Sequence, residues 1–170
     1  MRKSFLIVAF CAFSPTVFAG TTNLTDQLLD HLVGHWTLTG TLAGKKATHE
    51  ITAEWILNHG YVRLHELSRE KDPAGAPSYE AIVFICAEPH GGDYSCLWLD
   101  STGTWGISPQ AMGVAKRQTN SIPFLFKDPG GTVSFENTFN YNPTTDTWTW
   151  VMNNVQAGKR KPFGRVTLKR

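Results

Sequence analysis

The sequence predicts an all-β protein, an up-and-down antiparallel barrel of about 8–10 strands with one short N-terminal helix. Two observations carry this prediction. From position 36 onward, short segments in which apolar and polar residues alternate are separated by tight turns rich in Gly, Asn, Asp and Pro. Only the segment 24–32 has its apolar residues at helical spacing. Because no second helix is available to cover a sheet, closure into a barrel is the arrangement that removes exposed strand edges.

The first 19 residues have the pattern of a secretory signal peptide, with two basic residues after Met1, an apolar run at 5–13 and small residues before a cleavage site at Gly20. We expect 1–19 to be cleaved and 20–170 to form a single domain. The apolar run is too short to span a bilayer, so no stable membrane anchor is expected. The protein is then exported, and is periplasmic or secreted.

The charge balance argues against a nucleic-acid partner. The chain carries 16 Lys and Arg against 14 Asp and Glu, and removal of the two basic residues of the signal segment leaves the charges balanced. Binding to a phosphate backbone requires an excess of basic residues. The remaining chain is long enough to bury a core of its own without a structural metal.

A short helix over 24–32 is predicted to lead into a first strand that contains Trp36. The next strand is expected over 49–57, where His49 and Trp55 share a largely apolar face that we predict points inward. This hairpin therefore brings one histidine into the interior of the barrel.

The strand predicted over 61–69 has two competing faces. Arg63 and His65 lie on one face and Glu66 lies on the other. Alternation alone leaves both orientations open, because a shift of one residue in the pairing exchanges the two faces.

Two cysteines follow the signal segment and lie almost symmetrically about a turn between two apolar strands. In an exported protein, this placement of Cys86 and Cys96 favours a disulfide bond across the hairpin. Two buried thiols, or a redox-active pair, are the alternatives.

The most regular part of the sequence is a hairpin formed by 133–141 and 147–152, and a closing strand over 163–168 follows it. One face of the hairpin is aromatic and includes a single amide side chain. The residues of this face that bear on function are Asn137, Phe139, Trp148 and Trp150.

Three motifs give the chain a resemblance to a known family. Leu-Val-Gly-His-Trp at 32–36, Trp-Leu-Asp-Ser-Thr-Gly at 98–103 and the Tyr-x-Pro-x-Thr-x-x-Trp hairpin at 141–148 resemble the bacterial lipocalin-like family catalogued as domain of unknown function 1579. The resemblance covers most of the mature chain. It implies a calycin-type barrel in which Trp36 packs against a basic residue of the last strand, here Arg165. It implies no activity.

No cofactor or metal is expected. A related barrel family, the nitrobindins, binds haem through a histidine near its C-terminal end, and this chain has no histidine after His90. The histidines lie on separate segments without the H-E-x-x-H spacing of a zinc site. His49 and His65, on adjacent predicted strands, are the pair that could approach each other.

An interior lined by aromatic rings with a few polar groups is the usual form of a small-molecule site. The leading hypothesis is that a small, largely apolar or aromatic ligand binds inside the barrel. The residues predicted to bind it are Asn137, Arg63, His49, Trp55, Phe139, Trp148 and Trp150. The identity of the ligand and the oligomeric state are left open by the sequence.

Two other interpretations remain open at this point. In one, the protein is a small acid–base enzyme of the isomerase or hydrolase type, in which His65 works with a neighbouring carboxylate such as that of Glu66. In the other, the aromatic rings fill the barrel, and the protein is a structural or interaction module of the cell envelope. Its rim loops, 71–78 and 105–117, would then contact a partner.

Overall fold

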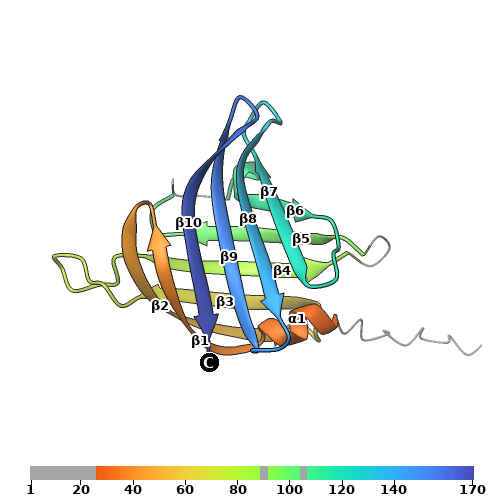
Figure 1. The fold of residues 1–170 in the computed structure, drawn as a ribbon, viewed down its shortest axis with the longest axis horizontal. Coiled ribbons are helices and arrows are strands. Elements are labelled where there is room, and N and C mark those ends of the chain that lie inside the picture. The colour runs from red at the N-terminus through yellow and green to blue at the C-terminus, as the bar shows by residue number, and fades with distance from the viewer. Residues whose placement is uncertain (1–25, 89–91, 104–106) are drawn as a thin grey trace, which may run out of the picture.

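The computed structural model describes residues 26–88, 92–103 and 107–170, and it is a closed antiparallel barrel (Figure 1). Each strand pairs with the next in the chain, and the last strand pairs with the first. The predicted fold class is confirmed. The predicted signal peptide lies outside the described residues. Within the described residues, no helix is both long and apolar enough to cross a membrane.

Within the part of the chain that the structure describes, there are ten strands, one α-helix and one short 3₁₀ helix. In chain order the elements are α1 (Gln27–Leu32), β1 (Gly34–Leu42), β2 (Lys45–Ile56), β3 (Tyr61–Ser68), β4 (Glu80–Ala87), β5 (Tyr94–Asp100), η1 (Pro109–Ala111), β6 (Met112–Ala115), β7 (Ser121–Lys127), β8 (Val133–Asn142), β9 (Thr147–Gln156) and β10 (Lys159–Lys169).

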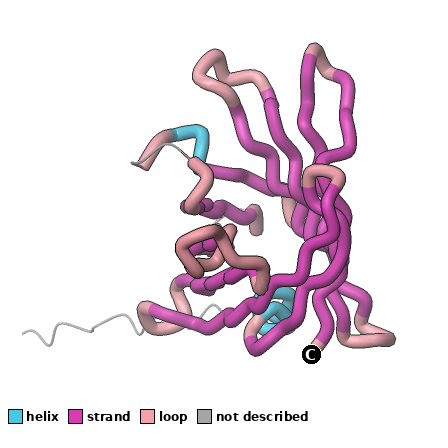
Figure 2. The backbone as a smooth tube through the Cα atoms, turned by 90° about the vertical axis from the view of Figure 1, so that its left-hand side faces the viewer, coloured by secondary structure: helices cyan, strands magenta, loops and turns pink. Residues whose placement is uncertain are grey.

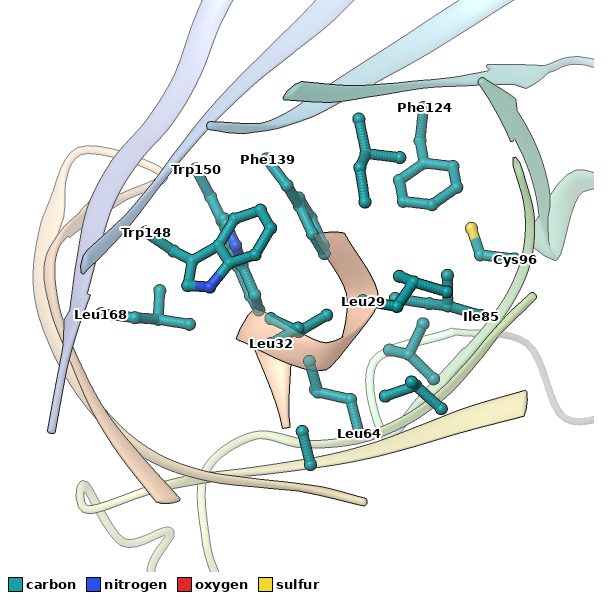
Figure 3. Packing of buried hydrophobic residues seen from close by; sticks show 14 of the residues in the cluster. Leu29, Leu32, Leu64, Ile85, Cys96, Phe124, Phe139, Trp148, Trp150 and Leu168 are labelled. Atoms are coloured by element: carbon teal, nitrogen blue, oxygen red, sulfur yellow. The ribbon is translucent and has the colours of Figure 1, made fainter. Parts of the chain in front are cut away.

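Helix α1 closes one end of the barrel. Asp26 caps it, because its carboxylate accepts a hydrogen bond of 3.0 Å from the backbone N–H of Leu29. Leu29 and Leu32 are fully buried, and Figure 3 shows both in the ring of side chains contributed by the strands. At the opposite end, the hairpins β7–β8 and β9–β10 extend beyond the other strands (Figures 1 and 2). The two ends of the barrel are therefore built differently.

The orientation of β3 is decided by its pairing with β2. Trp55 lies opposite Val62, and Ile51 lies opposite Glu66. Since directly paired residues share a face, the inward side of β2 makes Val62, Leu64 and Glu66 face inward. Arg63 and His65 consequently lie on the outer face.

The seam between β1 and β10 needs a glycine. Gly40 has a φ of +158°, and a Cβ atom added there would lie 2.3 Å from the carbonyl oxygen of Arg165 and 2.7 Å from the Cα of Val166. Only a residue without a side chain allows the two backbones to come this close. Closure of the barrel at this point thus depends on the identity of position 40.

The predicted partner of Trp36 is wrong. The guanidinium of Arg170 lies over the Trp36 ring, 4.0 Å from its centroid, whereas Arg165 is exposed on the outer face. The register explains the difference, because Thr37 pairs with Lys169 and the residue that follows β10 then lies beside Trp36. A basic residue does cover the indole, but it is the last one in the chain.

The predicted disulfide is also wrong, since both cysteines are free thiols. Cys96 pairs with Ile85 and faces the core, while Cys86 pairs with Ser95. Because Ile85 and Cys86 are consecutive in β4, their side chains leave opposite faces of the sheet. The thiols therefore point away from each other across the sheet. Burial raises the pKa of Cys96 to about 12.

Candidate functional site

A cavity of about 1330 Å³ that opens to solvent lies at the end of the barrel opposite α1. Its rim is formed by the β1–β2 turn, Glu70, the segments 78–80, 101–103 and 107–111, and the start of β8. This volume exceeds the roughly 300–1,000 Å³ of most ligand pockets. The interior is therefore not filled by its aromatic rings.

The walls of the cavity are mainly apolar. They come from strands on all sides of the barrel, which is why no single stretch of sequence shows the cavity. The principal apolar residues are Leu38, Trp98, Phe126, Phe135, Met152 and Phe163. Three polar side chains from β2, β3 and β8 also line it while being almost completely buried: His49, Glu66 and Asn137 have exposed fractions of 4%, 2% and 2%.

His49 and Glu66 form a buried hydrogen-bonded pair. The distance from His49 Nδ1 to Glu66 Oε1 is 2.5 Å. The two residues are diagonal neighbours on the paired strands, because Glu66 lies opposite Ile51 and His49 lies opposite Ser68. The pair faces the cavity, so any molecule inside meets an imidazole that is oriented by a carboxylate.

Tyr79 completes this wall of the cavity. Its ring stacks on His49 with 5.5 Å between centroids, and its hydroxyl oxygen accepts a 3.1 Å hydrogen bond from Trp98 Nε1. Burial, followed by the negative charges of Glu66 and Asp100, raises the pKa of Tyr79 far above its ordinary range. Tyr79 therefore keeps its proton at neutral pH and is a hydrogen-bond donor.

On another side of the cavity, two buried polar atoms have no hydrogen-bond partner among the described residues. They are Asn137 Oδ1 and Trp150 Nε1, and both residues line the cavity. The Trp150 ring stacks on Phe139 at 4.1 Å and meets Trp98 edge-on at 6.3 Å. Leaving a polar group buried without a partner costs about 1–3 kcal/mol. One acceptor and one donor of residues that line the cavity are thus left without a partner among the described residues.

Three of the aromatic residues predicted to bind ligand have other roles. Trp55 Nε1 donates a 2.8 Å hydrogen bond to the Asp30 carboxylate, and Trp148 Nε1 donates a 3.2 Å bond to the His31 carbonyl. Both indoles hold α1 in place. Phe139 lies beneath Trp150 in the core and does not line the cavity.

The predicted residues of β3 are divided between the two faces. Arg63 forms an ion pair with Glu54 on the outer surface, and His65 Nε2 lies 2.7 Å from Glu80 Oε1, also outside. His65 and Glu66 therefore point in opposite directions and cannot act together on one molecule. Arg63 is not a cavity residue.

The sequence prediction missed Tyr79 and the partnership of Glu66 with His49. Tyr79 follows an irregular segment and carries no alternation signal. The partnership could have been found from the 58–60 turn, which fixes the β2–β3 register. Among the described residues, no group of three or more His, Cys, Asp or Glu side chains is placed to hold a metal ion. Trp105, expected on a rim loop, lies outside the described residues.

No protein-family model and no curated protein matches the chain. The resemblance to the lipocalin-like family therefore stays a prediction.

Proposed function

We propose that the protein binds a small, largely apolar molecule in the barrel cavity, and that Asn137 and Trp150 hold a polar group of that molecule. The observation that carries the proposal is an apolar cavity with one buried acceptor and one buried donor left unpartnered. A molecule that supplies a donor to Asn137 Oδ1 and an acceptor to Trp150 Nε1 regains the free energy that these atoms lack in the empty barrel. The apolar walls then bury the rest of the molecule.

The proposal includes the predicted export of the protein. A binding protein of this kind would meet its ligand in the periplasm or outside the cell. We also propose membership of the lipocalin-like family, on the three sequence motifs alone. The cavity favours ligand binding over the filled-barrel interpretation, because a volume of about 1330 Å³ leaves room for a molecule of substantial size.

The test compares two probes that differ only in the polar group. Naphthalene and 1-naphthamide share an aromatic ring system, and the amide adds one donor group and one acceptor. We expect saturable binding with one molecule per barrel, measured by quenching of tryptophan fluorescence and by native mass spectrometry. The amide is expected to bind at least about tenfold more tightly, since two hydrogen bonds to buried groups are worth about 1.4 kcal/mol or more.

Two results would count against the proposal. Absence of saturable binding by both probes would eliminate the ligand site. Equal affinities for the two probes would leave a hydrophobic cavity but would remove Asn137 and Trp150 as its anchors.

A further inference from the structure

Among the described residues, two histidine–carboxylate pairs lie on β3 and its neighbours, and they differ in environment. The His65–Glu80 pair is on the outer surface, where the side chains are 33% and 49% exposed. The His49–Glu66 pair is in the cavity, where they are 6% and 3% exposed. The same chemical groups are therefore present once on the exposed surface and once buried in the wall of a mainly apolar cavity.

The geometry of the buried pair resembles that of an oriented base. In the neutral imidazole, the contact with Glu66 assigns the proton to Nδ1, because an ionised carboxylate can only accept. The lone pair is then on Nε2, and this atom has no hydrogen-bond partner among the described residues. A base that is held in one tautomer by a carboxylate is the arrangement that general-base catalysis requires.

We propose that the His49–Glu66 pair is an acid–base site, at which His49 moves a proton on a carbonyl compound bound in the cavity. His49 Nε2 accepts a proton from the carbon next to the carbonyl, and the electrons of the broken C–H bond delocalise onto the carbonyl oxygen as an enolate. The proton then returns from Nε2 to a different carbon of a conjugated system. The net change is an isomerisation, without oxidation and without a second reactant.

Tyr79 is placed to assist this reaction. Its hydroxyl oxygen already accepts from Trp98, so its own O–H is the remaining donor beside the His49 ring. A neutral hydroxyl can donate to the oxygen on which negative charge develops. Glu66 acts through His49 and is a positioning residue, because its carboxylate is hydrogen-bonded to the imidazole that moves the proton.

This inference rests on the proposed function, because a substrate must enter the cavity. The probe that tests both is 5-nitrobenzisoxazole, a flat aromatic molecule with one acidic C–H bond. A base removes that proton, the ring N–O bond breaks, and a yellow nitrile-bearing phenolate is released. The reaction needs only a base in an apolar site, and it is followed by absorbance.

Three variants distinguish the contribution of the buried His49–Glu66 pair to the elimination rate from that of the exposed His65–Glu80 pair. His49→Gln keeps a hydrogen bond to Glu66 but removes the base, and we expect kcat/KM to fall at least about 100-fold. Glu66→Gln should lower kcat by about tenfold or more at an unchanged KM. His65→Gln is the matched control, and its rate should equal that of the wild type.

Each outcome decides between the two proposals. If the benzisoxazole does not quench tryptophan fluorescence, the proposed cavity binding fails and this inference fails with it. If it binds but His49→Gln retains the elimination rate, only the acid–base site is overturned.

A second measurement tests the role of His49 without substituting it, in case the His49→Gln protein does not fold. Diethyl pyrocarbonate transfers an ethoxycarbonyl group to the free imidazole nitrogen, and peptide mass spectrometry locates it. In the His65→Gln protein, loss of elimination should follow modification of His49, and 1-naphthamide should protect against it. Loss of elimination activity that accompanies modification of a histidine other than His49 would overturn the proposal.

Discussion

Asn137 carries a buried polar atom at a position where an apolar residue would pack without cost. Its paired neighbours, Phe124 on β7 and Met152 on β9, are both apolar. Asn137 lines the cavity, and its buried side-chain oxygen has no partner among the described residues. Such a group lowers the stability of the empty barrel, and it is useful only to a molecule that hydrogen-bonds it.

We expect Asn137→Leu to stabilise the protein and to weaken polar recognition. The free energy of unfolding of the ligand-free protein should rise by about 1 kcal/mol, because a desolvated amide is replaced by an apolar group of similar size. The preference for 1-naphthamide over naphthalene should fall to nearly none. Urea unfolding and fluorescence titration measure the two effects.

The control is Asn153→Leu, one residue beyond Met152 and on the outer face of β9. It should alter neither the stability by more than about 0.5 kcal/mol nor the probe preference. A destabilised Asn137→Leu protein would mean that the amide is satisfied in the folded barrel.

The two thiols are predicted to be free and slow to react. Burial raises the pKa of both Cys86 and Cys96, and the thiolate is the reactive form. In the native protein without reductant, we expect slow alkylation by iodoacetamide, with Cys86 ahead of the more buried Cys96. After unfolding without reductant, both should be alkylated, as peptide mass spectrometry would show. If the two cysteines of the unfolded protein are alkylated only after reduction, they form a disulfide bond and the expectation of free thiols is wrong.

At the scale of the element, α1 is held by hydrogen bonds from three strands. Trp36 Nε1 donates to the Leu32 carbonyl at 2.8 Å, and the indoles of Trp55 and Trp148 donate to Asp30 and to the His31 carbonyl. The carbonyls at the end of a helix have no partner inside it. Two of these donors therefore satisfy backbone groups of a six-residue helix that would not form alone.

The N-terminus of α1 has its own anchor. Asp26 caps the helix and accepts hydrogen bonds of 3.2 and 3.1 Å from the Tyr94 hydroxyl. Arg117 forms an ion pair with the same carboxylate and lies over the Tyr94 ring, 4.9 Å from its centroid. One buried carboxylate thus connects α1, β5 and the segment after β6.

We expect Asp26→Ala to lower the free energy of unfolding by about 3 kcal/mol, because it removes the helix cap and leaves two donors without their acceptor. Lys116→Ala is the control, since it removes only the exposed ion pair with Asp93. That change should cost less than about 1 kcal/mol. Equal losses in the two variants, measured by urea unfolding, would show that α1 contributes little to the barrel.

At the scale of the whole molecule, buried tyrosines connect the stability of the barrel to alkaline pH. Tyr79 lies at the cavity end and Tyr94 at the helix end, and burial raises the pKa of each well above the ordinary tyrosine value of 10.0. Above that value the unfolded chain loses both protons, whereas the folded barrel keeps them. The folded state then binds more protons, so its stability falls as pH rises.

We therefore expect urea unfolding to show a progressive loss of stability above about pH 10. Tyr79→Phe should reduce this alkaline loss, because the phenylalanine has no proton to lose. Tyr61→Phe is the control, since Tyr61 is 41% exposed. An alkaline loss that is unaltered by Tyr79→Phe would assign the effect to other groups.

The sequence alone determined the fold class and several of the residues that line the cavity. Alternation and tight turns are local properties, so they predicted the strands, the short helix and the inward face of β2 with His49. They also predicted the aromatic face of β8 and β9, including Asn137 and Trp150. An aromatic interior with a few polar groups was therefore foreseeable from the chain.

The tertiary structure decided the orientation of the strands and the pairing of distant segments, which local sequence patterns do not contain. Alternation gives two faces to a strand but not which one is inside, and the register with β2 put Glu66 in and Arg63 and His65 out. Register likewise separated the two thiols and put Arg170 on Trp36. Whether an aromatic ring holds α1 or lines the cavity depends on its position along the barrel axis, because α1 and the cavity lie at opposite ends. Register, closure and the empty volume arise from contacts between distant segments, which is why only the folded barrel determined them.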